Sequence, residues 1–338
     1  PDGQQPLYSA CGRYVIAFNG EIYNFQALRA ELEPRRTSWR GHSDTEVLLA
    51  TIVEFGVEAA LKRCVGMFAF ALWDRQERTL TLARDRLGEK PLYYGWQNGV
   101  FLFGSELKAI RTHPAFRAEI DRDTVALFFR YSYIPAPYSI YKDIYKLAPG
   151  TLLKVGLRMV APPVPTAYWC ARDVAAAGLS GRYGGGDVDA IDELDRLLRR
   201  SIAGQATADV SVGAFLSGGV DSSTVVALMQ ALSSRSVKTF SIGFRETDYN
   251  EAEYAKAIAR HLGTEHTELY VTPKESLEVV PRLPIIWDEP FSDVSQIPTF
   301  LVAELTRRHV TVSLSGDGAD ELFGGYNRYA ELRWIWEK

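Results

Sequence analysis

The sequence is poor in cysteine, with only Cys11, Cys64 and Cys170 among its 338 residues. An odd number of widely separated cysteines indicates neither a disulfide framework nor a zinc site. The chain also lacks an apolar run of about 18 residues, the length that crosses a bilayer, and it lacks a signal-peptide pattern. These absences predict a cytoplasmic protein that has no membrane partner.

An excess of charge of one sign is absent too. Lys and Arg number 38 against 42 Asp and Glu, which leaves a formal net charge of −4. Without a basic excess we expect no nucleic-acid partner. The five histidines show no metal-ligand spacing, so we expect them at surface or helix-cap positions. The length predicts two domains, and 46% hydrophobic with 24% charged residues is the composition of a globular protein.

The first part of the chain is predicted to be rich in β-strand. Residues 14–18 form a short apolar strand that we expect to end at the turn signal Asn19-Gly20. We expect a helix at 45–55 and further strands at 67–73, 79–84, 92–96 and 100–103. The strand at 67–73 is too apolar to face water. Such dense pairing of aromatic and β-branched runs favours stacked sheets.

The second part alternates strands and helices. It follows a Pro-rich stretch and a Gly- and Ala-rich stretch, so we place an interdomain linker at 166–187, between domains at 1–165 and 188–338. Strands are predicted at 210–216, 239–244, 267–271 and 310–314, and helices at 188–202, 222–232, 251–262 and 299–308. This βαβ series predicts a parallel sheet covered on both faces, whose ligands bind at the carboxyl ends of the strands.

A polar, glycine-rich motif at 217–223 (Ser-Gly-Gly-Val-Asp-Ser-Ser) follows a predicted strand and precedes a helix. Its glycines let the backbone approach an anion, the helix N-terminus offers free N–H groups, and the serines add hydroxyl donors. This is a phosphate cradle without the lysine of the Walker loop. Asp221 would repel phosphate unless a bridging Mg²⁺ lies between them. The alternative is a plain Gly-Gly turn capped by Ser and Asp.

A second motif at 315–321 also follows a predicted strand, and Tyr326 comes soon after it. Three carboxylates within five residues repel one another unless water or a cation surrounds them. Taken alone, the motif is equally well read as an acidic surface turn that caps a helix. Together with the first motif, it predicts that Asp221 and Asp320 bind one Mg²⁺, which neutralises a departing pyrophosphate.

A third group of polar residues lies in the first part of the chain. Asn19 and Gly20 can stabilise an oxyanion through a side-chain amide and a backbone N–H. Glu21 can hold the α-ammonium group of an amino acid. Asp44 supplies a second carboxylate at a predicted helix start, where plain helix capping, helped by Thr45, is the stronger interpretation of Asp44 by itself.

These motifs resemble those of the glutamine-hydrolysing asparagine synthetases and follow the same order. Further matching strings lie at 66–70, 84–94, 103–108 and 288–293. The 217–223 motif resembles the pyrophosphate loop of the N-type ATP pyrophosphatases, which cleave ATP between its α and β phosphates. The resemblance implies an α+β αββα sandwich of the N-terminal-nucleophile hydrolase type, a class II glutaminase. An α/β parallel-sheet ATP-pyrophosphatase domain follows it.

The resemblance also implies roles for single residues. Asn19 and Gly20 would form the oxyanion hole, and Asn19, Glu21 and Asp44 would bind glutamine. The implied ATP-binding residues are Leu216, Ser217, Gly218, Gly219, Asp221, Ser222, Ser223, Ile242, Ser315 and Gly316. Asp221 and Asp320 would be the metal ligands, and Tyr326 would lie near an acyl-adenylate.

The implied function is amidation of aspartate to asparagine, with ATP, Mg²⁺ and glutamine-derived ammonia, through an acyl-adenylate. The products besides asparagine would be AMP, pyrophosphate and glutamate, and a homodimer is a candidate assembly. Two alternatives stay open: a related amidotransferase with another carboxylate acceptor, and a non-catalytic nucleotide-binding module.

The ends of the sequence depart from the family pattern. The family's nucleophile is an N-terminal cysteine whose α-amine acts as the base, whereas this sequence begins at Pro1. Cys11 corresponds to no family cysteine. A family lysine that stabilises the adenylation transition state has no counterpart before Lys338. We therefore expect a polypeptide of this sequence to hydrolyse no glutamine and to make little asparagine.

An aromatic run at 128–145 contains five tyrosines: Tyr131, Tyr133, Tyr138, Tyr141 and Tyr145. We interpret it as core or interdomain packing. The alternative is the wall of an ammonia passage.

Overall fold

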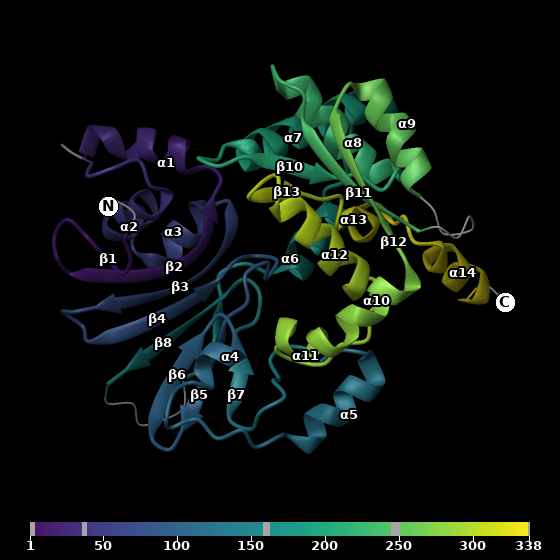
Figure 1. Cartoon of the computed structure of the whole chain (residues 1–338). Coiled ribbons are helices and arrows are strands. Elements are labelled where there is room, and N and C mark those ends of the chain that lie inside the picture. The colour runs from purple at the N-terminus through teal and green to yellow at the C-terminus, as the bar shows by residue number, and fades with distance from the viewer. Residues whose placement is uncertain (1–3, 36–38, 158–162, 245–250, 337–338) are drawn as a thin grey trace. The chain divides into compact units, whose positions relative to one another are not determined.

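A computed structural model describes residues 4–35, 39–157, 163–244 and 251–336 (Figure 1). The chain divides into two compact units. The first comprises Pro1–Gly184 together with Pro284–Ser292, and the second comprises Gly185–Leu283 together with Asp293–Lys338. No helix within the described ranges is long and apolar enough to cross a membrane.

The first unit contains two antiparallel sheets, with strand orders β1-β2-β3-β4-β8-β9 and β6-β5-β7 (Figure 1). The larger sheet is built from β1 (Leu7–Tyr8), β2 (Tyr14–Ile22), β3 (Gly66–Asp74), β4 (Thr79–Arg84), β8 (Thr151–Gly156) and β9 (Thr166–Ala167). The smaller sheet is built from β5 (Tyr93–Gln97), β6 (Val100–Gly104) and β7 (Ile144–Lys146). The helices are α1 (Phe25–Leu32), α2 (Asp44–Phe55), α3 (Val57–Arg63), α4 (Leu107–Ile110), α5 (Arg122–Tyr131) and α6 (Ala171–Ser180).

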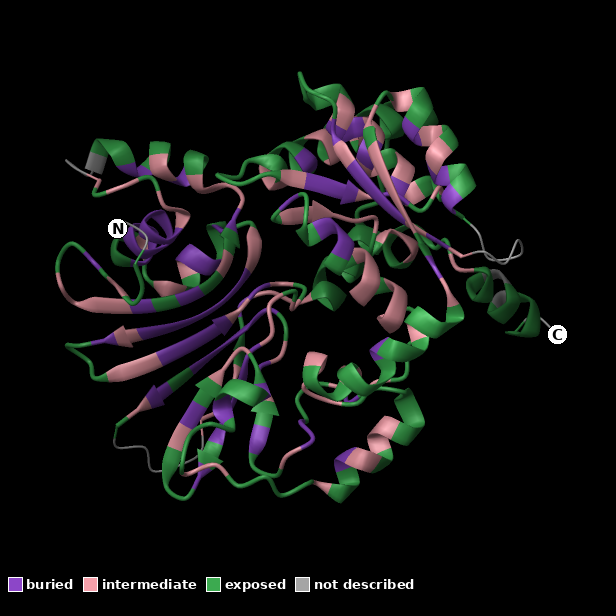
Figure 2. Ribbon diagram, in the orientation of Figure 1, coloured by how far each residue is buried: buried purple, intermediate pink, exposed green. Residues whose placement is uncertain are grey.

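Three apolar layers hold these elements together, and Figure 2 shows their buried residues along the strands. The first lies between the larger sheet and helices α1 to α3, with Phe70 and Leu48 at its centre. The second lies between the two sheets and contains Leu82, and the third joins the smaller sheet to α4 through Leu107. Each buried side chain of this size contributes about 1.5–3 kcal/mol. The layers confirm the predicted αββα sandwich.

Strand β3 is buried on both faces, as its apolar sequence predicts. Phe68 and Phe70 pack on the helix side, while Ala69 and Ala71 pack between the sheets. The small alanines let the second sheet approach.

The strand predicted at residues 14–18 does not end at the turn signal Asn19-Gly20, so that part of the prediction is wrong. Strand β2 continues to Ile22, and Gly20 pairs with Phe68 of β3. A Cβ atom at Gly20 would lie 2.1 Å from the Met67 carbonyl oxygen and 2.6 Å from the Phe68 Cα atom. Glycine is therefore required here by the close approach of two strands and not by a turn.

The second unit is a four-stranded parallel sheet of order β12-β11-β10-β13. The strands are β10 (Val212–Phe215), β11 (Lys238–Phe244), β12 (Glu265–Val271) and β13 (Val312–Leu314). The helices are α7 (Asp187–Ala206), α8 (Val220–Leu232), α9 (Ala252–Leu262), α10 (Pro273–Val279), α12 (Gln296–Arg307), α13 (Ala319–Phe323) and α14 (Asn327–Trp336); α11 (Leu283–Ile286) begins at the last residue of the 185–283 stretch. Side chains of α7, α8 and α9 pack on one face of the sheet, and Leu305 of α12 packs on the other. The predicted doubly covered parallel sheet is confirmed.

The sequence does not predict two features of the chain organisation. The stretch that we predict as a linker contains β9 and α6, and the first unit extends through it to Gly184. Segment Pro284–Ser292 belongs to the first unit, although the residues on both sides of it belong to the second.

The tyrosines of the aromatic run are mostly not core residues. Tyr131, Tyr133, Tyr138 and Tyr145 are between 41% and 53% exposed. The core interpretation is therefore wrong for these four.

Candidate functional site

The residues predicted to bind glutamine lie at the end of β2 and the start of α2. Phe18 and Ile22 of β2 point into the core, so Asn19 and Glu21 point to the opposite face and are exposed. An Asp44 carboxylate oxygen accepts a hydrogen bond from the Ile22 backbone N–H at 2.8 Å. This bond holds the start of α2 against the end of β2, beside Glu21.

A residue from another part of the first unit binds the Asn19 side chain. Its side-chain nitrogen donates to the Ser105 hydroxyl at 3.1 Å, and Ser105 directly follows strand β6. Three segments that are distant in the sequence therefore meet at this group of residues.

The helix cap of α2 is Ser43 and not Asp44. The Ser43 hydroxyl accepts the Thr45 backbone N–H at 3.1 Å, whereas Asp44 is the first helical residue. Plain capping is therefore the wrong interpretation of Asp44. Its second carboxylate oxygen accepts the Thr45 hydroxyl at 3.2 Å.

Glu46 supports the same region and was not singled out from the sequence. It is buried, and its two carboxylate oxygens accept the backbone N–H groups of Arg40 and Gly41, both at 3.0 Å. A glutamate three residues after Ser43 is the capping-box pattern, which is the signal that could have found it.

Several carboxylates act on Tyr23, the residue after β2. Burial raises the pKa of Tyr23, and the nearby carboxylates of Glu89, Glu21 and Asp85 raise this pKa further. Burial also raises the pKa of Glu89, and Asp85 adds to that effect. Glu89 comes from the loop after β4, and its charge acts on Tyr23. An ammonium group is the kind of ligand that such a region favours.

The predicted phosphate cradle lies at the carboxyl end of β10. Leu216 is buried, and its N–H bonds the Phe240 carbonyl of β11 at 2.9 Å. The next residues turn into α8, whose N-cap residue Gly219 provides no side-chain cap. The hydroxyl oxygens of Ser217 and Ser222 lie 2.9 Å apart, and the Ser223 hydroxyl donates to the Gly219 carbonyl at 2.6 Å. The loop therefore presents hydroxyl groups beside an uncapped helix N-terminus, as an anion site requires.

The second motif contacts the first. Strand β13 is the neighbour of β10, and Gly316 follows it at the same edge of the sheet. A Cβ atom at Gly316 would lie 2.8 Å from the Ser222 backbone nitrogen and 3.1 Å from the Asp221 Cβ atom. The structure thus brings the two predicted motifs together, with the first turn of α8 packed against the Gly316 backbone.

The rest of the second motif is held by its own side chains. The Ser315 hydroxyl donates to an Asp317 carboxylate oxygen at 2.9 Å, and the Tyr326 hydroxyl donates to Glu321 at 2.7 Å. The Tyr326 bond lowers the pKa of Glu321 and raises the pKa of Tyr326. The Asp320 carboxylate packs against the backbone of Gly325.

Two carboxylates at this edge of the sheet can contribute to a Mg²⁺ site but do not form a complete one. Among the residues with described placement, no group of three or more His, Cys, Asp or Glu side chains has metal-binding geometry. Mg²⁺ in nucleotide sites is usually bound by one or two carboxylates together with phosphate oxygens and water. Asp221 lies beside Gly316, and Asp320 follows Gly316 by four residues. These two carboxylates fit that kind of donor set.

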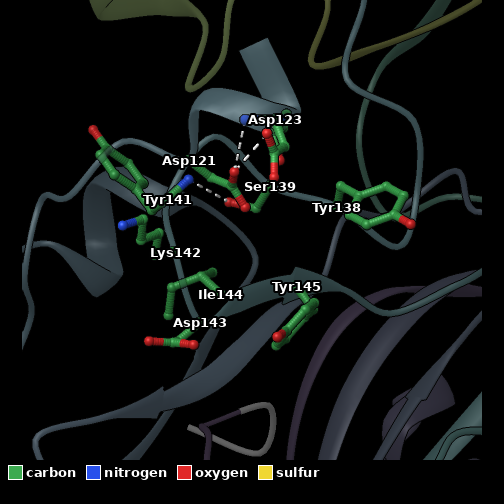
Figure 3. A pocket seen from close by; sticks show the side chains of 10 residues that line it. Asp121, Asp123, Tyr138, Ser139, Tyr141, Lys142, Asp143, Ile144 and Tyr145 are labelled. Atoms are coloured by element: carbon green, nitrogen blue, oxygen red, sulfur yellow. Dashed lines mark hydrogen bonds between the residues drawn. The ribbon is translucent and has the colours of Figure 1, made fainter. Parts of the chain in front are cut away.

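A separate pocket of about 280 Å³ lies in the first unit near the start of α5 (Figure 3). One of its acidic side chains has a structural role. Asp121 caps α5 by accepting the N–H groups of Asp123 and Thr124, at 3.0 and 3.3 Å. No residue that we predict to bind glutamine or ATP lines this pocket.

His266 departs from the expectation of surface or cap positions for the histidines. Its side chain is only 8% exposed, and its ring nitrogens lie 2.9 Å from the Thr239 hydroxyl and 3.2 Å from the Ser241 hydroxyl. Burial lowers the pKa of His266. Its position inside a polar network of β11 and β12 makes it a structural residue.

Comparison with known proteins identifies a family match for each half of the chain. Residues 1–169 match the family of the glutamine amidotransferase domain, and residues 193–338 match the asparagine synthase family. The chain therefore belongs to the family of the glutamine amidotransferase domain.

Similar curated proteins narrow the class. Asparagine synthetase [glutamine-hydrolyzing] 1 of Bacillus subtilis is 37% identical over 98% of this chain and 50% of its own length. A putative asparagine synthetase of Methanocaldococcus jannaschii is 38% identical over 92% of this chain and 59% of its own. Asparagine synthetase B of Escherichia coli is 31% identical over 96% and 54%. Over nearly its whole length the chain is similar to glutamine-hydrolysing asparagine synthetases, and it spans about half the length of these relatives.

Proposed function

We propose that the protein amidates aspartate to asparagine, using ATP and ammonia released from glutamine. The observation that carries the proposal is the contact of Gly316 with Asp221 and Ser222 in the first turn of α8. This contact joins a phosphate-binding loop to an acidic loop at the carboxyl edge of a parallel sheet, which is the arrangement that ATP cleavage at the α phosphate needs.

The ATP site is assigned to the second unit. Leu216, Ile242 and Gly316 would line the adenosine, and the α8 N-terminus would bind the phosphates with Ser217, Gly218, Gly219, Ser222, Ser223 and Ser315. Mg²⁺ bound by Asp221 and Asp320 would neutralise the pyrophosphate charge. An aspartate carboxylate oxygen attacks the α phosphorus, and the bond to pyrophosphate breaks. Ammonia then attacks the acyl carbon and AMP leaves, with Tyr326 near the acyl-adenylate.

The glutamine site is assigned to the first unit. The Asn19 amide and the Gly20 N–H would stabilise the oxyanion that forms when the glutamine amide is attacked. Glu21 and Asp44 would hold the ammonium group. The bond from Ile22 supports this role for Asp44, because a carboxylate oxygen that accepts one hydrogen bond keeps a lone pair for a second donor.

The same proposal covers the organisation of the protein. Residues 1–165 would act as the glutaminase domain and 188–338 as the synthetase domain, on either side of a linker at 166–187. We place the enzyme in the cytoplasm, with small-molecule substrates and a homodimer as its candidate assembly.

The test uses the full-length gene product and measures AMP formed from Mg²⁺-ATP, with and without aspartate. Asp221→Asn should lower AMP formation strongly. Asp187→Asn is the matched control because Asp187 is also an acid in the first turn of a helix of the second unit, and it should change nothing. AMP formation that depends on another carboxylate would move the function to a different acceptor. ATP binding without turnover would favour a non-catalytic nucleotide-binding module.

A further inference from the structure

A buried carboxylate that is not among the predicted glutamine-binding residues contacts β3, the strand that pairs with Asn19 and Gly20. Asp85 is fully buried at the end of strand β4. Its two carboxylate oxygens accept hydrogen bonds from five backbone N–H groups, those of Phe68, Leu87, Gly88, Glu89 and Lys90, at 3.1, 3.1, 2.6, 2.9 and 2.9 Å. A buried charge is tolerated only when it is well paired, and these donors provide that pairing.

The two oxygens of Asp85 bind different parts of the unit. One accepts the N–H groups of Leu87, Gly88 and Glu89, and so closes the loop after β4. The other accepts the N–H of Phe68 in β3, as well as that of Lys90. Because the Asp85 N–H also donates to the Phe68 carbonyl at 2.8 Å, both backbone groups of Phe68 are held by this one residue.

Phe68 is the strand partner of Gly20, the proposed oxyanion-hole residue. The backbones of the two residues are so close that no Cβ fits on Gly20. Any shift of Phe68 must therefore move Gly20.

Arg84 completes the loop from the other side. Its guanidinium donates to the carbonyl oxygens of Gly88, Lys90 and Leu147, at 2.7, 2.8 and 2.8 Å. The N–H groups of the loop are thus bound by Asp85 and its carbonyls by Arg84. Hydrogen bonds therefore hold the loop through both kinds of backbone group.

We infer that Asp85 is a positioning residue of the glutamine site, which through Phe68 holds the Gly20 N–H where glutamine reacts. This inference rests on the proposed glutaminase function of the first unit. Asp85 itself is too buried to touch the substrate, so it acts through Phe68.

The test is Asp85→Asn in the full-length gene product. An amide has one accepting oxygen, so one of the two sets of N–H groups must lose its acceptor and face an NH₂ group instead. We expect glutamine hydrolysis to lose about 10- to 100-fold in kcat/KM, because a displaced oxyanion donor costs that order of rate. Synthesis from added ammonia should keep its rate, since it does not use the glutamine site.

The chain offers a matched control at the other end of the same hairpin. Asp74 is also buried, and it accepts the N–H groups of Gln76 and Glu77 at 2.9 and 3.2 Å. It pairs with Tyr14, at the opposite end of β2 from Gly20. Asp74→Asn should therefore leave glutamine hydrolysis unchanged.

Equal kcat/KM losses in the Asp85 and Asp74 variants would overturn the inference, and so would an equal loss of ammonia-dependent synthesis in Asp85→Asn.

If the unmodified protein hydrolyses no glutamine, the proposed function fails. Positioning is then tested by hydrogen exchange, which Asp85→Asn should accelerate at Gly20 and Asp74→Asn should not. If Asp85→Asn does not fold, Asp85→Glu serves instead, because it keeps the charge but displaces the carboxylate oxygen that binds Phe68. It should lower kcat/KM for glutamine hydrolysis and leave ammonia-dependent synthesis unchanged, and an unchanged kcat/KM contradicts the inference.

Discussion

Replacement of Lys146 by methionine should destabilise the first unit by about 3–5 kcal/mol, the usual cost of leaving a buried charge without its partner. The Lys146 ammonium lies 2.5 Å from a Glu289 carboxylate oxygen, and the two side chains are only 17% and 9% exposed. Without the lysine, Glu289 keeps the Ile140 backbone N–H at 2.7 Å and the Tyr93 hydroxyl at 3.4 Å. These neutral donors do not compensate a buried charge.

The consequence should be local, because Glu289 anchors segment Pro284–Ser292 to the first unit. Asp288 supports the same anchor by accepting the Leu107 N–H of α4 at 2.6 Å. In Lys146→Met, hydrogen exchange in Pro284–Ser292 and in strand β7 should accelerate by roughly two to four powers of ten. Urea unfolding followed by circular dichroism gives the matching change in free energy.

Lys142→Met is the control for the loss of a lysine. Lys142 pairs with Glu119, but these side chains are 49% and 59% exposed, so the loss of this pair should cost little stability. The double variant Lys146→Met/Glu289→Met should recover much of the lost stability, since it leaves no buried charge. Equal destabilisation by Lys146→Met and Lys142→Met would refute the reasoning.

Three further predictions concern single residues. Gly20→Ala should cost about 1–3 kcal/mol in urea unfolding and abolish glutamate release, because its Cβ would lie 2.1 Å from the Met67 carbonyl oxygen; wild-type glutamate release would contradict this. Gly316→Ala should lower kcat/KM for ATP at least about tenfold in an AMP assay, because its Cβ would lie 2.8 Å from the Ser222 nitrogen; unchanged kinetics would separate the two loops functionally. Burial lowers the pKa of His266, so its contribution to stability is present above a pH of about 6.5 and is lost as pH falls below it. The thermal midpoint of the second unit should fall between about pH 7.5 and 5.5, and His266→Gln should reduce that fall; an identical fall in the variant would exclude His266 as its source.

Much of the fold follows from local patterns in the sequence. Strand β3 could be predicted as buried on both faces because its apolar residues do not alternate with polar ones. Helix α9 could be predicted to end at Gly263, which has the left-handed conformation (φ 73°) that closes a helix. The order of strands and helices in the second unit required the parallel sheet. That sheet in turn predicts that the two glycine-rich motifs lie at the same edge.

The remaining features depend on contacts between distant residues. Asn19-Gly20 has the sequence of a turn, yet β3 keeps it extended, and nothing near it in the sequence shows this. The roles of Asp85 and Glu289 arise from N–H groups and a lysine that only folding brings to them. For the same reason, the sequence alone did not reveal that Pro284–Ser292 belongs to the first unit.

The measurement that tests the central claim most directly follows nitrogen from glutamine to product. The full-length gene product is incubated with Mg²⁺-ATP, aspartate and glutamine labelled with ¹⁵N at the amide. The account predicts that the label appears in the side-chain amide of asparagine, with one AMP formed for each asparagine. AMP formed without a labelled amide, or glutamine hydrolysed without AMP, would contradict it.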